Sequence, residues 1–316
     1  MVTAYNRKEF VIEAVRSVLG QKYPRSRMEI ILLKNFKDRE IAYFCEENGI
    51  RNILMPDGPV GLYLNYGVEN AKYDIIAFLD DDDAFLPDKL SKIDSVFRKN
   101  NNIPYYHNLK ANIGEEQNYQ HEPKIELIDT KALSKRIMIK HVFKAGKWEN
   151  LSCVAINRKY YREANRILPQ LQEVTDLFFL TFAADTGMEL CFDETILNVY
   201  RFHESASNIS AEDTERIIKM EHLFRRYLVA YDLISENVSR NELRSVIAFK
   251  SVSFKLYCNV ISKTPRVKAL RELIATLSKI LFCIDVKSLK SVFQWVNYTI
   301  KPNNAYTRIV KSVTQK

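Results

Sequence analysis

The chain of 316 residues lacks several features that would place it in whole classes of protein. Its five cysteines are scattered, odd in number and without metal-ligand spacing, which favours structural thiols in a reducing compartment over a disulfide framework. No charge-free apolar run approaches the roughly 20 residues of a membrane-spanning helix, and no signal peptide opens the sequence. No recognisable nucleic-acid-binding motif accompanies the basic residues. We therefore expect a cytoplasmic protein with no spanning helix and no nucleic-acid partner.

Apolar and basic residues are plentiful, but the charge is unevenly spread. Apolar side chains make up 47% of the chain, enough to pack one large domain or two smaller ones. The net charge is +8 overall, yet the segment 240–316 holds 15 lysines and arginines against 3 acids, a net of +12. The rest of the chain therefore carries −4, and this asymmetry predicts two regions with different partners.

An acidic stretch, Asp80–Asp83, directly follows the apolar run 74–79, which predicts a buried strand. Four adjacent carboxylates repel one another and raise each other's pKa. A hard cation such as Mg²⁺ or Mn²⁺ is the usual remedy, with carboxylate and phosphate oxygens as its ligands. The alternative is a solvated acidic turn, although ordinary turns carry fewer acids. The pattern predicts a metal-dependent phosphate site.

Helical and strand patterns alternate along the first part of the chain. Helices are predicted at 11–19, at 39–48 and up to residue 71, and strands at 28–33, 51–55 and 74–79. This order predicts an α/β fold with an open, mostly parallel sheet flanked by helices. Ligands of such sheets bind at the carboxyl ends of the strands, where Tyr5, Asn35 and Asp80 are expected to cluster.

Four motifs carry a resemblance to a known family. The segment 79–90 runs from the acids through Pro87 into a helix and resembles the Asp-x-Asp segment of family 2 glycosyltransferases of the GT-A fold. The segments Thr3–Arg7, Glu173–Leu180 and Tyr200–Ser207 resemble other motifs of that family, in the expected order. The resemblance covers residues 1–208 and implies the GT-A nucleotide-diphospho-sugar transferase fold. It also implies inverting transfer of a sugar, with a UDP-sugar favoured as donor, to a hydroxyl of a glycan or lipid-linked acceptor.

The resemblance also implies roles for individual residues. Donor-binding roles fall on Thr3, Ala4, Tyr5, Asn6, Arg7, Asn35, Asp80, Asp81 and Arg201. Asp82 and His203 are the implied ligands of Mg²⁺ or Mn²⁺, and Asp81 is the substitute if the register slips by one. Asp176 is the implied general base, since an acceptor hydroxyl is a poor nucleophile until a carboxylate takes its proton. Without the family, the preferred interpretation of Asp176 is an acid at a helix N-terminus, which the helix dipole favours.

The sequence departs from the family in three places. The second strand ends in Lys34-Asn35 where the family has paired Asp residues, and Asn35 is expected to hydrogen-bond a base edge instead. Leu64 stands where the family has an Arg that meets the diphosphate. Only Met1-Val2 precede Thr3, where a strand of about five residues is typical, so we expect a first strand that is cut short because the given sequence starts late.

Two further regions leave alternatives open. Trp148 and Glu149 are predicted acceptor contacts, although a Trp covering the core under a loop is as common. Past residue 209, apolar stripes lie opposite basic residues in segments 267–281 and 286–300. These helices favour either binding to an anionic membrane surface or packing on the catalytic domain or a second subunit of a homodimer.

We therefore predict a GT-A glycosyltransferase domain at residues 1–208 and a helical, basic C-terminal region at 209–316, peripheral on the inner face of the cell membrane. Two other functions fit the same residues. A nucleotidyltransferase would use the acids for phosphoryl chemistry and would need no base at Asp176. A non-catalytic, membrane-associated relative would bind nucleotide sugars through a pocket that has decayed at Lys34-Asn35 and Leu64.

Overall fold

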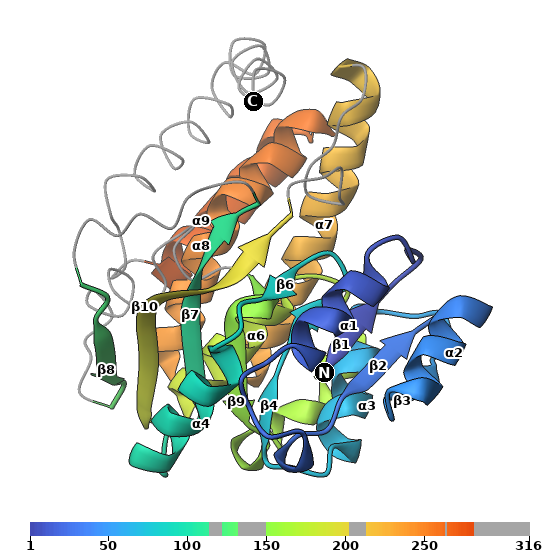
Figure 1. The fold of residues 1–316 in the computed structure, drawn as a ribbon. Coiled ribbons are helices and arrows are strands. Elements are labelled where there is room, and N and C mark those ends of the chain that lie inside the picture. The colour runs from blue at the N-terminus through green and yellow to red at the C-terminus, as the bar shows by residue number, and fades with distance from the viewer. Residues whose placement is uncertain (114–121, 132–149, 202–212, 263, 281–316) are drawn as a thin grey trace. The chain divides into compact units, whose positions relative to one another are not determined.

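The computed structural model describes residues 1–113, 122–131, 150–201, 213–262 and 264–280 (Figure 1). The described residues up to 201 form one compact unit, here the first unit, and those from 213 form a second, here the helical unit. The predicted domain boundary at residue 208 lies outside the described residues. So do Trp148, Glu149 and His203, and the apolar stripe predicted at 286–300.

A parallel sheet at the start of the first unit confirms the predicted fold class. Within the described residues its strand order is β3-β2-β1-β5. Its strands are β1 (Val2–Ala4), β2 (Ile31–Lys34), β3 (Arg51–Leu54) and β5 (Leu79–Asp80). Thr3 of β1 lies opposite Leu33 of β2 on one side and Asp80 of β5 on the other. The carboxyl ends of these strands therefore meet at one edge.

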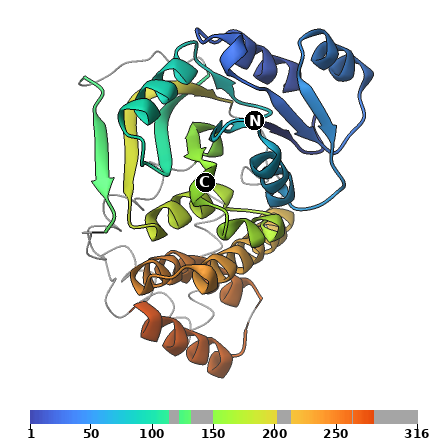
Figure 2. The ribbon, with the colours of Figure 1, turned by 90° about the horizontal axis from the view of Figure 1, so that it is seen from below.

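Helices cover both faces of this sheet because alternate residues of a strand point to opposite faces. Leu32 packs in a cluster with α1 (Val11–Leu19) and α2 (Arg39–Glu47). Leu33 packs in another cluster with Tyr63 of α3 (Val60–Asn70). Figure 2 shows α3 on the opposite side of the sheet from α1 and α2. Both faces are thus buried, as the apolar strands predict.

The predicted strand 74–79 is divided between two sheets. β4 (Ile75–Ala77) pairs antiparallel with β9 (Val154–Asn157), whereas β5 pairs with β1. Between them lies Phe78, which is fully buried and whose N–H donates to the Val154 carbonyl at 3.1 Å. The strand therefore changes partners immediately before the four acids.

A mixed sheet completes the first unit. Its order is β4-β9-β7-β10-β6, with β8 paired to β10. β7 and β10 are parallel, and the other pairs are antiparallel. The remaining strands are β6 (Ala84–Phe85), β7 (Tyr105–Asn112), β8 (Ile125–Asp129) and β10 (Glu189–Tyr200). In the described part of the first unit, the α-helices that follow the acidic stretch are α4 (Lys89–Lys99) and α6 (Thr175–Asp185). Short 3₁₀ turns are η1 (Arg25–Arg27), η3 (Leu151–Cys153), η4 (Arg158–Tyr160), η5 (Ala164–Arg166) and η6 (Leu168–Gln170).

The helical unit consists, in its described part, of α7 (Asp213–Asn237), α8 (Asn241–Ile261) and α9 (Arg266–Ile280). Aromatic rings hold α7 to α8: Phe224 lies 5.1 Å and Tyr227 5.2 Å from Phe254, measured between ring centroids. Ala269 and Leu273 of α9 are buried. In the described part of the chain, no helix has the length and hydropathy to cross a membrane.

Candidate active site

The carboxyl ends of β1 and β5 bring the first two predicted segments together. Thr3 is nearly buried, and its hydroxyl donates to Asp80 Oδ1 at 3.4 Å. The Thr3 carbonyl accepts a bond from the Asp81 N–H at 3.1 Å. Ala4 is fully buried, so its contribution to a ligand site is limited to its backbone. The site is thus anchored on the parallel sheet.

Arg7 lies directly against the acidic loop, which we define as residues 80–83. Its guanidinium contacts both oxygens of Asp81, with Nε 3.0 Å from Oδ2 and Nη2 2.5 Å from Oδ1. The same Nη2 lies 2.6 Å from Oδ2 of Asp82. Forked contacts of this kind are among the strongest ion pairs in proteins. Arg7 therefore neutralises part of the loop's charge.

The acidic loop nevertheless holds an excess of negative charge. Burial raises the pKa of Asp80 well above its usual value, and the charges of Asp83, Asp82 and Asp81 raise it further. Burial also raises the pKa of Asp81, although the bond from Arg7 acts in the other direction. Burial likewise raises the pKa of Asp83. Carboxylates gathered in this way favour a bound cation, so their chemistry fits Mg²⁺ or Mn²⁺. Among the described residues no three His, Cys, Asp or Glu side chains form a complete ligand set, and the predicted ligand His203 lies beyond them.

Asn150 links the acidic loop to the predicted base. Its side-chain amide donates to Asp83 Oδ2 at 3.2 Å, and its backbone N–H donates to Asp176 Oδ2 at 3.1 Å. The other oxygen of Asp176 accepts from the Leu177 N–H at 2.7 Å, at the start of α6. The two carboxylates that the sequence places 93 positions apart thus share one intermediate residue. Asn150 belongs to no motif that the sequence reveals.

Ser152, two residues after Asn150, also hydrogen-bonds to the acidic loop. Its hydroxyl accepts a bond from the Asp80 N–H at 3.0 Å and hydrogen-bonds the Asp83 side chain. Arg201, at the end of β10, adds a backbone N–H to Asp83 Oδ1 at 3.3 Å. The Arg201 guanidinium instead contacts Glu13 at 2.5 Å and lies over the Phe10 ring.

Backbone strain gathers at this edge of the sheet. Among the described residues, the non-glycine positions with positive φ are Asn6 (55°), Asn150 (126°) and Val174 (55°). At a φ of 55°, Asn6 and Val174 lie in the range of the left-handed region, which asparagine tolerates but which a β-branched residue adopts only at a cost. Asn150, with φ 126° and ψ 115°, lies outside that region. Asn6 follows β1, Asn150 binds two carboxylates, and Val174 immediately precedes α6 and Asp176. Strain of this kind is typical of functional sites.

Asn35 occupies the end of β2, as predicted, but its amide is already engaged. Its Nδ2 donates to Asn6 Oδ1 at 2.6 Å and to Asp57 Oδ1 at 2.8 Å, and its Oδ1 accepts the Asn6 N–H at 2.8 Å. Asp57 was absent from the sequence prediction. It follows β3, so the tendency of ligands to bind at the carboxyl ends of parallel strands could have identified it. Tyr5 is 43% exposed beside these groups, with its ring centroid 6.0 Å from that of buried Tyr63.

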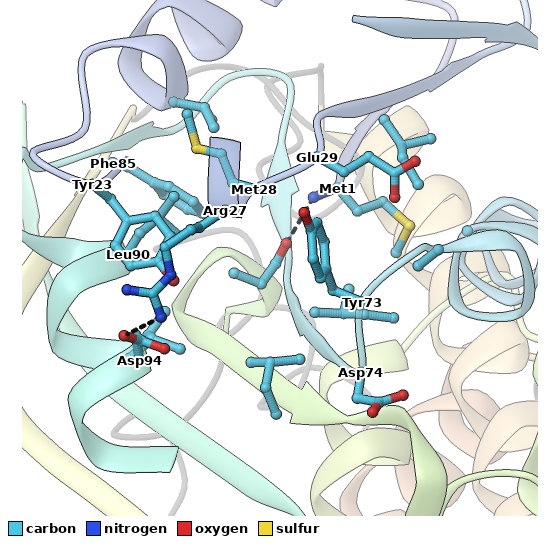
Figure 3. Close-up of a pocket in the computed structure, with 18 of the residues that line it drawn as sticks. Met1, Tyr23, Arg27, Met28, Glu29, Tyr73, Asp74, Phe85, Leu90 and Asp94 are labelled. Carbon is cyan, nitrogen blue, oxygen red and sulfur yellow. Dashed lines mark hydrogen bonds and ion pairs between the residues drawn. The ribbon is translucent and has the colours of Figure 1, made fainter. Parts of the chain in front are cut away.

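A pocket of about 390 Å³ lies at the other end of the sheet (Figure 3). Met1, Glu29 and Tyr73 are among its lining residues. The Met1 ammonium donates to the Ala77 carbonyl at 2.8 Å, and burial lowers its pKa to about 5. The pocket is lined mainly by apolar residues, which come from the amino-terminal sides of β1, β2 and β4 and from segment 23–29, α1, α3, β6 and α4. It contains no residue of the acidic loop, so the carboxyl-end site is the stronger candidate for chemistry.

Comparison with known proteins gives the class. The family model described as Glycosyl transferase family 2 matches residues 1–166, more than half of the chain. An uncharacterised glycosyltransferase of Haemophilus influenzae is 25% identical over 291 residues, which are 88% of this chain and 93% of the relative. The chain therefore belongs to glycosyl transferase family 2, and its activity is that of a nucleotide-sugar glycosyltransferase.

Solved structures agree on the fold. The structure of S. aureus TarS 1–349 in complex with UDP-GlcNAc superposes with a TM-score of 0.59 at 12% identity, over 99% of this chain and 90% of that one. A mannosyltransferase of Pyrobaculum calidifontis, in complex with GDP-Man and Mn²⁺, superposes with a TM-score of 0.53 at 12% identity, over 99% of this chain and 83% of that one. At these identities the likeness establishes the GT-A-like fold alone.

Proposed function

We propose that the chain catalyses inverting transfer of a sugar from a nucleoside diphosphate sugar, a UDP-sugar by preference, to a hydroxyl of a glycan or lipid-linked acceptor. The observation that carries this proposal is the continuous set of hydrogen bonds from the acidic loop through Asn150 to Asp176. A donor-binding group and a base are thereby held on one framework, as transfer between two bound substrates requires.

The donor nucleotide lies, on this proposal, along the carboxyl ends of β1, β2 and β5. Asp80 is assigned to the ribose, and exposed Tyr5 offers a ring face to the base. Because Asn35 is bonded to Asn6 and Asp57, its role is to orient Asp57, whose carboxylate then accepts a hydrogen bond from the base. Arg201 is assigned to the diphosphate, which requires its guanidinium to exchange Glu13 for a phosphate oxygen.

A divalent cation fits the acidic loop, with Asp82 and His203 as the proposed ligands. When bound, Mg²⁺ or Mn²⁺ neutralises charge on the departing diphosphate. The solved P. calidifontis mannosyltransferase carries Mn²⁺, which supports this assignment. Asp82 reaches the cation only if its contact with Arg7, at 2.6 Å, loosens or if its second oxygen serves as the ligand. Arg7 therefore holds the loop together in the absence of ligand.

Asp176 is the proposed general base. Its carboxylate is oriented by two backbone N–H groups, from Asn150 and Leu177, at the first turn of α6. A fixed carboxylate near the acceptor hydroxyl accepts its proton as the oxygen attacks the anomeric carbon from the face opposite the diphosphate. Trp148 and Glu149, next to Asn150 in the chain, remain the proposed acceptor contacts.

The helical unit is proposed to hold the enzyme at the inner face of the cell membrane. Val267, Leu270 and Ile274 of α9 are 65%, 45% and 59% exposed, on the stripe predicted from the sequence. Lys268 and Arg271 on the same helix are also exposed. Apolar and basic groups presented together suit an anionic lipid surface. A homodimer that buries the same stripe is the alternative.

The direct test is turnover of a panel of nucleoside diphosphate sugars with Mn²⁺. We expect one donor, a UDP-sugar first, to release its nucleoside diphosphate, and release to accelerate with a suitable acceptor. Release of pyrophosphate would instead identify a nucleotidyltransferase. Tight binding of a donor without any product would identify a non-catalytic relative.

A further inference from the structure

Lys89 is buried in a place where a charged side chain needs an explanation. It opens α4 and has no exposed surface, and its Nζ lies 4.1 Å from the centroid of the Phe85 ring. The ammonium donates at 2.5 Å to the Ser152 carbonyl and at 2.5 Å to Asn198 Oδ1. Lysine is almost never fully buried unless it is paired.

Both of these acceptors are neutral. Within the described part of the chain, no carboxylate lies within ion-pair distance of the ammonium, so hydrogen bonds and the ring face must offset its lost hydration. Burial lowers its pKa to about 7, whereas Cys153 and Asp83 act weakly in the opposite direction. An apolar side chain of this length would fill the site at a smaller desolvation cost. A buried ammonium at this position is therefore best explained by the two oxygen atoms to which it donates hydrogen bonds.

The ammonium bonds to the Ser152 carbonyl, and residues next to that carbonyl in the chain bond to the carboxylates of the candidate active site. Asn198 supports the same carbonyl through an Nδ2 bond of 2.8 Å, and Asn108 donates to Asn198 Oδ1 at 2.8 Å. From segment 150–153, the Ser152 hydroxyl binds the acidic loop, and Asn150 binds both Asp83 and Asp176. A shift of the carbonyl would therefore be transmitted to both carboxylates at once.

We propose that Lys89 is a positioning residue for catalysis, which together with Asn198 fixes segment 150–153 and thereby the distance between the acidic loop and Asp176. This role rests on the function proposed above for the two carboxylates. Displacing a catalytic group by about 1 Å costs on the order of 10²-fold in rate. The expected signature is a loss of turnover with donor affinity preserved.

The matched pair of variants is Lys89→Met and Lys92→Met. Both remove a lysine from α4, but the Lys92 ammonium lies 3.7 Å from Asp193 on strand β10. Among the described residues it forms no hydrogen bond or ion pair with Ser152 or the acidic loop. In donor hydrolysis with Mn²⁺, we expect Lys89→Met to lower kcat by about 10²-fold with KM changed by less than about threefold. Lys92→Met should retain parental kcat per folded molecule. A parental kcat in Lys89→Met, or an equal loss in both variants, overturns the proposal.

A double-mutant cycle with Asn198→Ala tests the shared target. If both side chains act through the Ser152 carbonyl, the loss of kcat in Lys89→Met/Asn198→Ala is smaller than the product of the two single losses. A loss equal to that product contradicts a common route. Lys89→Gln, which keeps a neutral donor, replaces Lys89→Met in this cycle if the methionine variant fails to fold.

Amide hydrogen exchange separates this inference from the proposed function, because it needs no substrate. Exchange of the Asp80 and Asn150 amides should accelerate in the folded Lys89 variant and remain parental in Lys92→Met. Unchanged exchange at both amides refutes the positioning role even if the enzyme is active. Accelerated exchange in a chain that hydrolyses no donor supports the role of Lys89 and shows that the proposed reaction is the part that failed.

Discussion

Charged groups are used in opposite ways by the acidic edge of the first unit and by α9 of the helical unit. At the edge, Asp81 and Asp83 are 5% and 4% exposed, and Arg7, Asn150 and Ser152 bond to the loop at fixed distances. On α9, Lys268 and Arg271 face solvent beside an exposed apolar stripe. Buried charges act over short distances and in fixed directions, whereas exposed ones act over a Debye length and are screened by salt. We therefore expect mutations at the acidic edge to change the rate of sugar transfer, and mutations on α9 to change binding to the membrane.

The largest effect is expected at the acidic loop. Asp82→Ala should reduce transfer by more than about 10³-fold, because a metal ion contributes several kcal/mol to the stabilisation of the departing diphosphate. Circular dichroism and the melting temperature should stay near parental values, since Arg7 retains its forked contact with Asp81. Asp88→Ala, at an exposed acid just beyond the loop, is the control. Parental activity in Asp82→Ala would show that the cation, if one binds, has other ligands.

A smaller loss is expected at the proposed base. Asp176→Asn keeps the shape of the side chain and removes the proton acceptor. Because the Asn150 and Leu177 N–H groups bond to different oxygens of Asp176, the single oxygen of asparagine keeps only one of these two bonds. Turnover should fall about 10²–10⁴-fold with donor affinity little changed, as measured by steady-state kinetics. Turnover near the parental value would point to Glu173 or to an acceptor that assists its own deprotonation.

Reversal of charge on α9 should move the protein without altering its chemistry. Each basic residue at an anionic surface contributes on the order of 1 kcal/mol, so Lys268→Glu/Arg271→Glu should weaken binding to anionic vesicles by about 30-fold or more at low salt. Lys99→Glu/Lys159→Glu, at exposed lysines of the first unit, changes the net charge equally and serves as the control. If both double variants lose vesicle binding equally, or if the parental protein binds neutral vesicles as well as anionic ones, α9 is not an electrostatic anchor. Donor hydrolysis should be parental in both double variants.

The smallest effect concerns stability and pH. Burial lowers the pKa of Lys89 to about 7, below the ordinary value of about 10.4 that applies in the unfolded chain. Between these values the unfolded state binds more protons, so this lysine makes the free energy of unfolding rise with pH, by at most about 1.4 kcal/mol per pH unit. Asp83 and Cys153 are the ionisable groups that act on this ammonium, and both are present in the parental protein and in Lys89→Met. Urea unfolding at several pH values should therefore show that the free energy of unfolding rises less steeply with pH in Lys89→Met than in the parental protein. An identical pH dependence in the two proteins would mean that the Lys89 ammonium is hydrated in the folded state.

Much of the fold was predictable because burial dictates it. The strands β1 and β2 are buried throughout, and the alternating order of strand and helix patterns indicated a parallel sheet flanked by helices. Lys34 lies within β2 although it is charged, since its stem is buried and its ammonium reaches the Phe36 carbonyl at 2.7 Å. The division at Phe78 was not predictable, because an apolar run does not reveal which of two distant strands it pairs with.

The site was predictable where chemistry is concentrated in consecutive residues. The acidic loop and the segment Thr3–Arg7 meet as expected, since the strand-end rule places them together. Asn150, Ser152 and Lys89 carry no motif. Asn150 and Ser152 contact the acidic loop, and Lys89 contacts Ser152, only because segments more than 60 residues apart pack together. On α9 the apolar stripe was identified, but sequence alone did not decide between a packed and an exposed stripe. The structure buries Ala269 and Leu273 and exposes Val267, Leu270 and Ile274.

Calorimetry of nucleoside diphosphate binding, with and without Mn²⁺, tests whether the acidic loop is a cation-dependent diphosphate site. We expect one nucleoside diphosphate, UDP first, to bind at least about tenfold tighter with Mn²⁺ than with chelator, since the cation links the loop to the phosphates. Asp82→Asn should remove the difference while leaving metal-free binding unchanged. The account is contradicted if no nucleoside diphosphate binds the parental protein, or if Mn²⁺ strengthens binding equally in the parent and in Asp82→Asn.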